Sequence, residues 1–319
     1  MIYLEQFRFP TVEQEEDCIT ALSSSLSSYC DDAYPFKITT GHELYSLDFE
    51  PITLLCGGNG CGKSTILNII GRKLYADRHS LYNTTKYMAA FVELCKYTEA
   101  PVLAGEELFK DRERIKKYKY DIEKYCHVIT SDDIFKSMLD LRMTNEQKLH
   151  KSIFIGKDLL YTRSNNYDSE TAPKYIDLET GNGLKEYRMA RDLQKLSFKK
   201  YMEKTVGKIE RSFSNGETAL MKLSEKLESP GLYILDEPEN SMSCEFQIQL
   251  ANLIEFFAYR GECQFIIATH SPFLMAMKNA KIYNLDHTPV DVCNWWEVEN
   301  MKHFFELFEG AREYFIKGD

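Results

Sequence analysis

A glycine-rich segment near residue 60 has the residue types and spacing needed to bind phosphate groups. The sequence GGNGCGKST at 57–65 matches G-x-x-x-x-G-K-[S/T]. Glycines let several backbone N–H groups point at one anion, and the start of a following helix adds partial positive charge. Lys63 and Ser64 would then reach the terminal phosphates and a magnesium ion. The predicted phosphate-binding residues are Gly57, Gly58, Asn59, Gly60, Cys61, Gly62, Lys63, Ser64 and Thr65.

Two adjacent acids follow an apolar run in the sequence LYILDEPENS at 232–241. Asp236 is suited to hold magnesium through a water ligand, while Ser64 would bind the same ion directly. Glu237 is placed to polarise a water molecule that attacks a phosphate. A phosphotransferase needs no such base, so this second acid favours hydrolysis.

A histidine ends another apolar run, in the sequence FIIATHSPF at 265–273. A histidine at a strand end is often only a surface or packing residue. Because His270 follows a buried strand downstream of both acids, we expect it to contact the terminal phosphate. Glu237, His270 and Lys63 are therefore the predicted catalytic residues.

The sequence FSNGETALM at 213–221 places a serine, a glycine and an acid before an apolar run. Ser214 and Glu217 have the spacing of a capping box, which satisfies free N–H groups at a helix start. Such a helix start could also bind an anion outside its own chain. The stretch alone leaves both interpretations open.

Buried strands that alternate with helices must position these motifs. We expect strands at 51–56, 231–235, 263–269 and 281–286, and amphipathic helices at 63–74 and 246–259. Ser271 and Pro272 suit the start of a further helix. The alternation predicts an α/β fold with a mostly parallel central sheet and helices on both faces.

The middle of the chain differs in composition. Residues 76–209 are rich in Lys, Glu and Tyr, which predicts a mainly helical insert within a single domain at 1–319, with a hairpin or loop at 161–183. Two parts are basic: 110–124 has seven Lys or Arg against four Asp or Glu, and 185–211 has nine against four. Their interleaved signs are typical of a solvated helix face, and the alternative is a surface for nucleic acid or a protein partner.

The overall composition argues against several classes of protein. The 319 residues carry a formal charge of −10, whereas proteins that coat duplex DNA are usually basic. No apolar run approaches the ~20 residues of a membrane-spanning helix. The amino-terminal MIYLEQFRFP predicts a strand, not a signal peptide. The nine cysteines, without a C-x-x-C pair, then favour reduced thiols in the cytoplasm.

The order of GGNGCGKST, FSNGE, LYILDEPENS and ATHS resembles the ABC-type ATPases. More narrowly, it is similar to the soluble ATPases related to the SMC and RecF proteins, often grouped as small AAA-family ATPases. The likeness includes YPFKI at 34–38 and HSPFLMAMKNAKIYNLD, and covers roughly 1–75 and 210–290. It implies an ABC-type P-loop fold in which GGNGCGKST is the Walker A motif and LYILDEPENS the Walker B motif. It also implies that ATP and Mg²⁺ are bound and that ATP is hydrolysed.

The resemblance makes FSNGE the signature motif, which contacts the γ-phosphate held by a second subunit. Its residues would be Ser214, Asn215, Gly216 and Glu217. The loop at 239–243 would cross the same interface with Asn240 and Ser241. Two subunits would close head to tail around two ATP molecules and reopen on hydrolysis. Phe213 and Asn215 stand where transporter-type signatures have a leucine and a second glycine.

Two further parts of the family pattern have only candidate residues. Asp132, Asp133 and Gln147 are candidates for the position of the Q-loop glutamine. Tyr34 and Phe36 are candidates for the aromatic residue that stacks on adenine.

The resemblance implies an ATP-gated homodimer that serves DNA maintenance or anti-phage defence with a separate protein effector. DNA could be bound through the basic insert. One alternative is a nucleotide-dependent scaffold with negligible turnover, which the presence of Glu237 disfavours. The other is the ATPase subunit of a transporter, which the degenerate signature and the lack of an apolar membrane segment disfavour.

Overall fold

A computed structural model describes most of the chain, namely residues 2–23, 33–81, 83–99, 125–165, 200, 203, 206–208 and 214–316. The chain divides into two compact units. One unit combines Met1–Phe135 with Asn215–Asp319, and the other is Lys136–Ser214. The expectation of one domain with an insert at 76–209 stays a prediction. None of the described helices is long and apolar enough to span a membrane.

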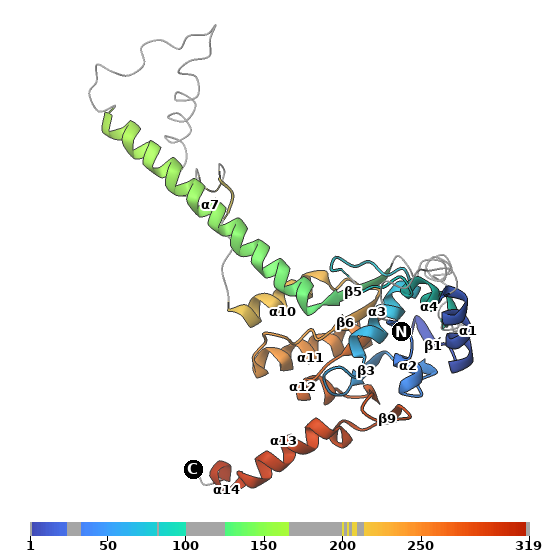
Figure 1. Cartoon of the computed structure of the whole chain (residues 1–319). Helices are drawn as coiled ribbons and strands as arrows, with labels where there is room; N and C mark the ends of the chain where they lie inside the picture. Colours follow the sequence, from blue (N-terminus) through green and yellow to red (C-terminus); the bar gives the residue numbers. More distant parts are fainter. Residues whose placement is uncertain are drawn as a thin grey trace, which may run out of the picture. The chain divides into compact units, whose positions relative to one another are not determined.

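A six-stranded sheet forms the centre of the first unit (Figure 1). Its strand order is β5–β6–β7–β3–β8–β9, and every neighbouring pair is parallel except β8 and β9. The strands are β3 (Ile52–Cys56), β5 (Cys126–Thr130), β6 (Gly231–Asp236), β7 (Cys263–Ala268), β8 (Lys281–Asn284) and β9 (Asp291–Cys293). This sheet confirms the predicted α/β fold with a mostly parallel centre.

The inner strands consist of apolar runs because helices cover the sheet. Every residue of β3 and of β7 is buried, as expected for parallel strands that are packed on both faces. Helix α3 packs against β5, β6 and β7, while α11 packs against β7 and α10. These helices are α3 (Lys63–Lys73), α10 (Asn215–Lys226) and α11 (Cys244–Tyr259). Helix α12 (Pro272–Met275) begins where expected, since the Ser271 hydroxyl accepts bonds from the N–H groups of Phe273 and Leu274.

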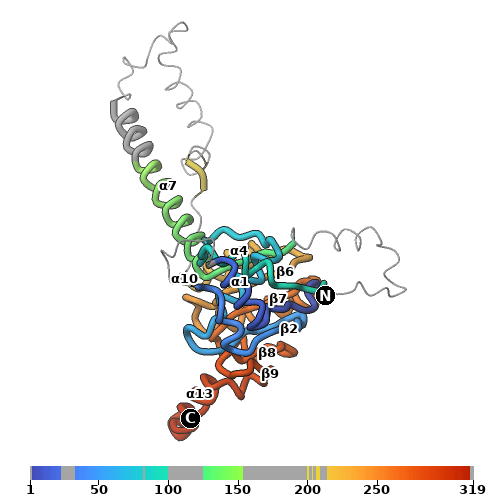
Figure 2. The backbone as a smooth tube through the Cα atoms, turned by 45° about the vertical axis from the view of Figure 1, so that its right-hand side comes forward, coloured from blue at the N-terminus to red at the C-terminus, as the bar shows by residue number. Residues whose placement is uncertain are grey.

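A smaller antiparallel sheet lies beside the central one, in the order β2–β1–β4. Its strands are β1 (Leu4–Arg8), β2 (Ser46–Asp48) and β4 (Lys96–Glu99), with helices α1 (Val12–Ser23), α2 (Ile38–Gly41) and α4 (Met88–Leu94) nearby in the chain. Figure 2 shows α1 beside α4, although they are distant in sequence. The buried Gln264 amide accepts from the N–H groups of Tyr3 and Leu4 at 2.8 and 2.9 Å, which ties β1 to β7.

The middle of the chain departs from the sequence-based expectation at two places. Strand β5 lies within the expected helical insert. It has only five residues, CHVIT, and so short an apolar run is a weak signal of a strand. Helix α7 (Ser131–Asn165) includes residues 161–165, so the prediction of a hairpin or loop is wrong there. The helical spacing of apolar residues continues through Leu160, and turn-forming residues begin only at Ser164. Residues 166–183, the basic segment 110–124 and most of the basic segment 185–211 lie outside the described residues.

Candidate nucleotide site

The glycine-rich loop joins the end of β3 to the start of α3, as predicted. Gly62 immediately precedes the helix with φ 95°, a left-handed conformation that favours glycine. A Cβ atom at Gly62 would lie 2.9 Å from the Ile38 side chain, so a larger residue would strain the loop. Asn59 and Gly60 are exposed at its tip. The loop therefore presents backbone N–H groups and a helix start to solvent, an arrangement suited to an anion.

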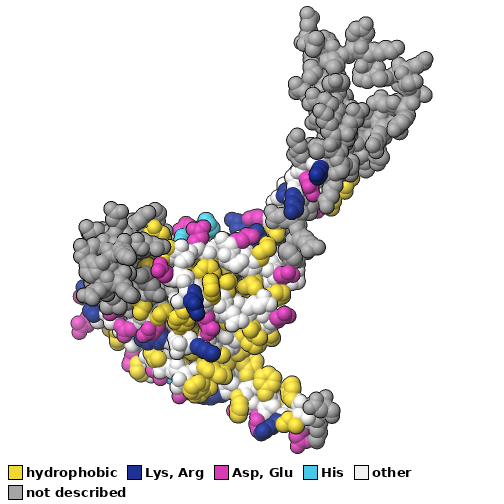
Figure 3. Space-filling view, turned by 180° about the vertical axis from the view of Figure 1, so that it is seen from behind, with side chains coloured by type: hydrophobic (Ala, Val, Ile, Leu, Met, Phe, Trp, Pro, Cys, Tyr) yellow, Lys and Arg dark blue, Asp and Glu magenta, His cyan; other side chains and the backbone are white. Residues whose placement is uncertain are grey.

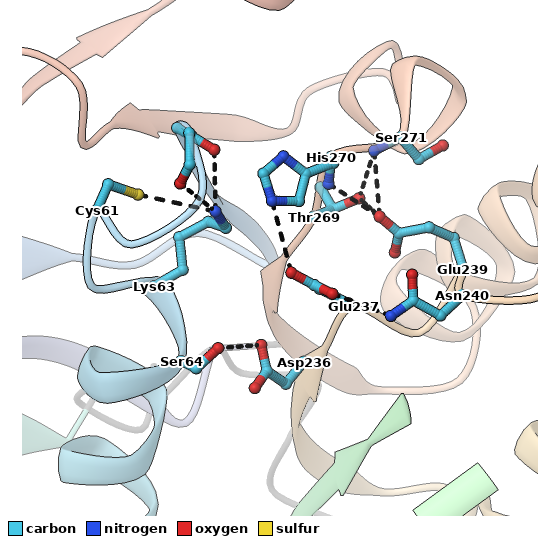
Figure 4. Close-up of polar contacts among 12 residues, drawn as sticks. Cys61, Lys63, Ser64, Asp236, Glu237, Glu239, Asn240, Thr269, His270 and Ser271 are labelled. Carbon is cyan, nitrogen blue, oxygen red and sulfur yellow. Dashed lines mark hydrogen bonds and ion pairs between the residues drawn. The ribbon is translucent and has the colours of Figure 1, made fainter. Parts of the chain in front are cut away.

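Lys63 is buried within this loop. Its ammonium group donates hydrogen bonds to the carbonyl oxygens of Gly57 and Gly58, both at 2.9 Å, and lies 3.7 Å from the Cys61 sulfur (Figure 4). The two carbonyl bonds hold the positive charge within the turn of the loop. Phosphate oxygens could replace those carbonyls as acceptors, with stronger charge-assisted bonds.

Ser64 and Asp236 come together although β7 separates their strands. The Ser64 hydroxyl donates to one carboxylate oxygen of Asp236 at 3.0 Å (Figure 4). Burial raises the pKa of Asp236, and the bond from Ser64 opposes that shift. A hydroxyl and a carboxylate are the hard oxygen donors that Mg²⁺ prefers, and phosphate oxygens and water commonly complete its coordination. These two residues therefore fit a magnesium ion bound together with a phosphate ligand.

Glu237 and His270 face each other from neighbouring strand ends. His270 Nε2 lies 3.5 Å from a Glu237 carboxylate oxygen, and the Asn240 amide donates to the other oxygen at 2.9 Å (Figure 4). Glu237 has φ 47°, which is uncommon for a residue other than glycine. Burial, reinforced by the Lys63 charge, lowers the pKa of His270 below its usual 6.5. At neutral pH the ring is therefore uncharged.

Glu239 is a site residue that the motif analysis missed. Its side chain is buried, and one carboxylate oxygen accepts three bonds: from the Thr269 hydroxyl at 2.6 Å, His270 N at 2.9 Å and Ser271 N at 3.1 Å (Figure 4). These bonds fix the backbone turn that carries His270. In the sequence, Glu239 is the third acid of DEPE, and it was assigned there only to the predicted interface loop at 239–243.

Asp286 is the other residue that sequence reasoning missed. It follows β8, and its two carboxylate oxygens accept from Gly58 N at 2.8 and 3.0 Å. The acid therefore fixes the first turn of the phosphate loop. Its sequence context, NLD, gives no local sign of that contact, because 228 residues separate the two partners.

The predicted signature residues differ in exposure. Helix α10 begins at Asn215, so Ser214 directly precedes a helix, as the capping interpretation expects. Ser214 and Asn215 are exposed, Glu217 is half-buried and Gly216 is buried. A Cβ atom at Gly216 would lie 2.9 Å from the Phe246 ring of the same chain. Ser214 and Asn215 are thus the accessible members of the motif.

The predicted interface loop closely follows Asp236 and Glu237 in the chain. Asn240 is exposed and bonded to Glu237, and Ser241 is exposed with φ 70°. The positive φ turns the chain sharply before α11 begins. Contact of this loop with a second subunit stays a prediction.

The candidates for the Q-loop position occupy different surroundings. Strand β5 ends at Thr130, which is paired in register with Asp236. Asp133 is buried and accepts from Thr130 N at 2.9 Å, whereas Asp132 is exposed. Gln147 is exposed within α7 and belongs to the second unit. Asp132 is therefore the candidate whose side chain is accessible near this strand end.

The two aromatic candidates for adenine stacking also differ. Phe36 is buried and packs edge-on against Phe91 with ring centroids 5.2 Å apart. Tyr34 is half-buried, and its hydroxyl donates to Thr65 at 3.3 Å, beside the phosphate loop. Tyr34 has the more accessible ring.

Comparison with known proteins places these motifs in a family context. The family model described as "ABC transporter" matches residues 45–240, more than half of the chain. Residues 57–65 and the two acids lie inside this range.

Curated relatives match a shorter part of the chain. The zinc import ATP-binding protein ZnuC of Vibrio vulnificus, from strains YJ016 and CMCP6, is 33% identical over 75 residues. The match covers 23% of this chain and 29% of each relative's length.

Two solved structures show low overall similarity. The Smc head domain of Pyrococcus furiosus, solved with the C-terminal domain of ScpA, is 14% identical, with 84% of this chain and 95% of that chain covered and a TM-score of 0.36. A nucleotide-free ATP-binding cassette from an ABC transporter is 15% identical, with coverages of 82% and 87% and a TM-score of 0.35.

Proposed function

Because the chain belongs to the ABC transporter family, we propose that it binds ATP together with Mg²⁺ and hydrolyses the γ-phosphate bond. The observation that carries this proposal is the convergence of three strand ends. Lys63 and Ser64 follow β3, Asp236 ends β6 and is followed by Glu237, and His270 follows β7. The Ser64–Asp236 contact of 3.0 Å and the Glu237–His270 contact of 3.5 Å join these ends into one site.

Each residue has a role in the proposed reaction. The backbone N–H groups of the loop and Lys63 bind the phosphates, and Ser64 and Asp236 would hold Mg²⁺, which supplies charge stabilisation to the phosphate oxygens. Glu237 accepts a proton from the attacking water. The uncharged His270 ring donates its N–H to a γ-phosphate oxygen. Glu239 holds the backbone that aims this ring.

The further proposal is that ATP gates a head-to-tail homodimer. Ser214 and Asn215 of one subunit would contact the γ-phosphate held by the other, with Asn240 and Ser241 beside them. Hydrolysis removes that shared contact and reopens the dimer. We further propose a cytoplasmic protein that acts in DNA maintenance or anti-phage defence through a separate effector, with DNA contact through the basic insert. Exposure of Ser214 and Asn215 supports the dimer, and the sequence resemblance supports the pathway.

Phosphate release by the Glu237→Gln variant tests the catalytic proposal. Replacing the base should lower the rate at saturating ATP and Mg²⁺ by at least about 100-fold, the usual contribution of general base catalysis. ATP affinity should stay within a few-fold, because the loop and Lys63 are unchanged. Glu5→Gln, in the exposed face of β1, is the matched control and should retain the full rate.

Two results would contradict this assignment. A Glu237→Gln variant with an undiminished rate would exclude Glu237 as the base. A wild-type protein that binds ATP but releases no phosphate above background would instead indicate a nucleotide-dependent scaffold.

A second candidate is the ATPase subunit of a transporter. The 75-residue match to ZnuC, whose name describes a zinc import ATP-binding protein, favours this possibility. A transporter subunit should copurify from cells with a membrane-embedded partner after mild cross-linking. Recovery without such a partner, with full ATPase activity, would argue against it.

A further inference from the structure

Glu15 in α1 is one of only three acidic side chains that are buried among the residues the structure describes, together with Asp133 and Glu239. Figure 3 shows other acidic side chains at the surface of one face. A buried carboxylate needs hydrogen-bond donors in place of water. Glu239 and Asp133 each fix the chain at a strand end, after β7 and β5, by accepting bonds from backbone N–H groups. Glu15 binds a different segment, the turn at 37–40.

One carboxylate oxygen of Glu15 holds this turn. It accepts from the backbone N–H of Lys37 at 2.8 Å and from the Thr40 hydroxyl at 3.0 Å. The other oxygen is buried without a hydrogen-bond partner among the described residues. Lys37 has φ 67°, a left-handed conformation that is uncommon for a residue other than glycine. The two bonds to Glu15 therefore stabilise a backbone conformation that lysine by itself does not favour.

The turn contacts the phosphate loop directly. A Cβ atom placed on Gly62 would lie 2.9 Å from Ile38 Cγ2, so the Ile38 side chain packs closely against the backbone of Gly62. Gly62 has φ 95° and immediately precedes α3. The Tyr34 hydroxyl, from the same segment, lies 3.3 Å from the hydroxyl oxygen of Thr65 in the first turn of α3. The segment YPFKI at 34–38 therefore contacts both the loop and the helix that follows it.

We propose, on the basis of the ATP binding proposed above, that Glu15 is a positioning residue for the nucleotide. Through the turn at 37–40 it holds Ile38 against Gly62, and this contact fixes the backbone N–H groups that receive the phosphates. Glu15 acts on binding and not on the attack of water, because the proposed catalytic residues Glu237 and His270 follow other strands, β6 and β7.

Binding of ADP with Mg²⁺, measured by calorimetry, tests this role without hydrolysis. Glu15→Ala should raise the dissociation constant roughly tenfold, the factor that corresponds to one typical hydrogen bond. Glu15→Gln keeps an acceptor oxygen and should stay within about twofold of the wild type. Thr40→Val removes one of the two bonds, so it should weaken binding in the same direction even if Glu15→Ala does not fold.

Three outcomes of this titration would contradict the role of Glu15. Wild-type affinity in both Glu15→Ala and Thr40→Val would overturn it, and so would a Glu15→Gln variant that binds as weakly as Glu15→Ala. A wild-type chain that binds no ADP would overturn it together with the ATP binding on which it rests.

Gln264→Ala is the matched control, because it also removes a buried acceptor that holds another segment. Gln264 Oε1 accepts from the N–H groups of Tyr3 and Leu4, at the start of β1 and not in the phosphate loop. Both Gln264→Ala and Glu15→Ala should unfold at lower denaturant concentration, whereas only Glu15→Ala should bind ADP more weakly. An equal loss of ADP affinity in the two variants would assign Glu15 a purely structural role and overturn the proposal.

A double-mutant cycle tests whether Glu15 acts through Ile38. Ile38→Ala removes the contact with Gly62 and should by itself raise the ADP dissociation constant. Combined with Glu15→Ala, it should raise this constant by less than the product of the two single changes, because both act through the same contact. A combined effect equal to that product would show that the two residues act independently, and it would overturn the route through Ile38.

Phosphate release separates an effect on binding from an effect on catalysis. Glu15→Ala should raise the KM for ATP and leave kcat within about twofold, because a contact made equally in the ground and transition states changes only binding. The proposed base predicts the opposite pattern for Glu237→Gln, a lower kcat with nearly unchanged affinity. A Glu15→Ala variant with lowered kcat and unchanged KM would overturn the positioning role and leave the Glu237 proposal intact.

Discussion

At the scale of single residues, Glu239 shows how a carboxylate can fix the backbone that carries His270, one of the proposed catalytic residues. Its three acceptor contacts define the turn Thr269–Ser271, so His270 has a fixed backbone beside Glu237. The other carboxylate oxygen of Glu239 is buried without a hydrogen-bond partner among the described residues. Burial consequently raises the pKa of Glu239 above its usual 4.5.

Two substitutions of Glu239 distinguish the effect of its acceptor oxygen from the effect of its buried charge. Glu239→Ala leaves three donors without their acceptor, so it should lower the free energy of unfolding by about 1–3 kcal/mol and reduce phosphate release. Glu239→Gln retains an acceptor oxygen, so it should retain most of the unfolding free energy and most of the phosphate release. Denaturant unfolding and phosphate release measure the two effects. Equal behaviour of the Ala and Gln variants would exclude the acceptor role.

The unfolding free energies of the wild type and the Glu239→Gln variant should depend differently on pH, and the sign of the difference follows from the pKa of Glu239. The folded state raises the pKa of Glu239, so it binds this proton more tightly than the unfolded chain does. Any stability from the group is present below pH 4.5 and is lost as pH rises through the folded-state pKa. The wild type should therefore lose unfolding free energy relative to Glu239→Gln as pH rises from 4.5 through the folded-state pKa. A constant difference over this range would contradict the raised pKa.

At the scale of elements, the start of α10 has two sides with different constraints. Its exposed side carries Ser214 and Asn215, and its buried side carries Gly216 against α11. The Cβ of any other residue at 216 would also lie 3.3 Å from the backbone of Met242, in the loop that follows Asp236 and Glu237. Glycine at this point therefore allows α10 to approach that loop closely.

Gly216→Ala should weaken this packing. The added methyl group lies too close to Phe246 and Met242, so we expect the free energy of unfolding to fall by about 1–3 kcal/mol, measured with denaturant. Gly310→Ala at the end of α13 (Glu299–Gly310) is the control, because a Cβ atom at this position would meet nothing within 4 Å and alanine favours helix. Its stability should be unchanged or slightly higher. A Gly216→Ala protein as stable as wild type would show that Phe246 can move aside at no cost.

At the scale of the whole molecule, the proposed composite sites can be tested by mixing defective subunits. Lys63→Ala removes the lysine proposed to bind phosphate, and Ser214→Arg places a large side chain at the exposed residue of the predicted signature. Each variant alone should be inactive. A mixed dimer retains one intact site, formed by Lys63 of one subunit and Ser214 of the other.

Coexpression of the two variants should recover activity. If half the dimers are mixed and sites act independently, phosphate release should reach about a quarter of the wild-type rate in a symmetric dimer. Differently tagged subunits allow the mixed dimers to be purified and assayed. Mixed dimers with no more activity than the single variants would exclude a shared site.

Much of the fold follows from local sequence patterns. The strands at 52–56, 231–236 and 263–268 and the helix at 244–259 are long apolar or amphipathic runs, which alternate as a parallel sheet requires. The helix start at Ser271–Pro272 has a local chemical cause that is visible in the sequence. Strand β5 was harder to predict, because its five residues lie between charged segments and their burial depends on pairing with β6 and packing against α3.

The sequence by itself determined that the glycine-rich loop, the two acids and the histidine lie at the ends of strands, because apolar runs and residue types are visible locally. The phosphate-binding and catalytic roles of these residues are predictions from the same pattern. The sequence also determined that parallel strands would bring these ends together. Only the tertiary structure decided that Asp286 holds Gly58, that Glu239 holds the turn of His270, and that Phe36 is buried while Tyr34 is accessible. The physical reason is that hydrogen bonds and burial depend on residues far apart in the chain, and local patterns do not specify how close such residues lie in space. Glu239 and His270 are 31 positions apart, and Gly58 and Asp286 are 228 apart.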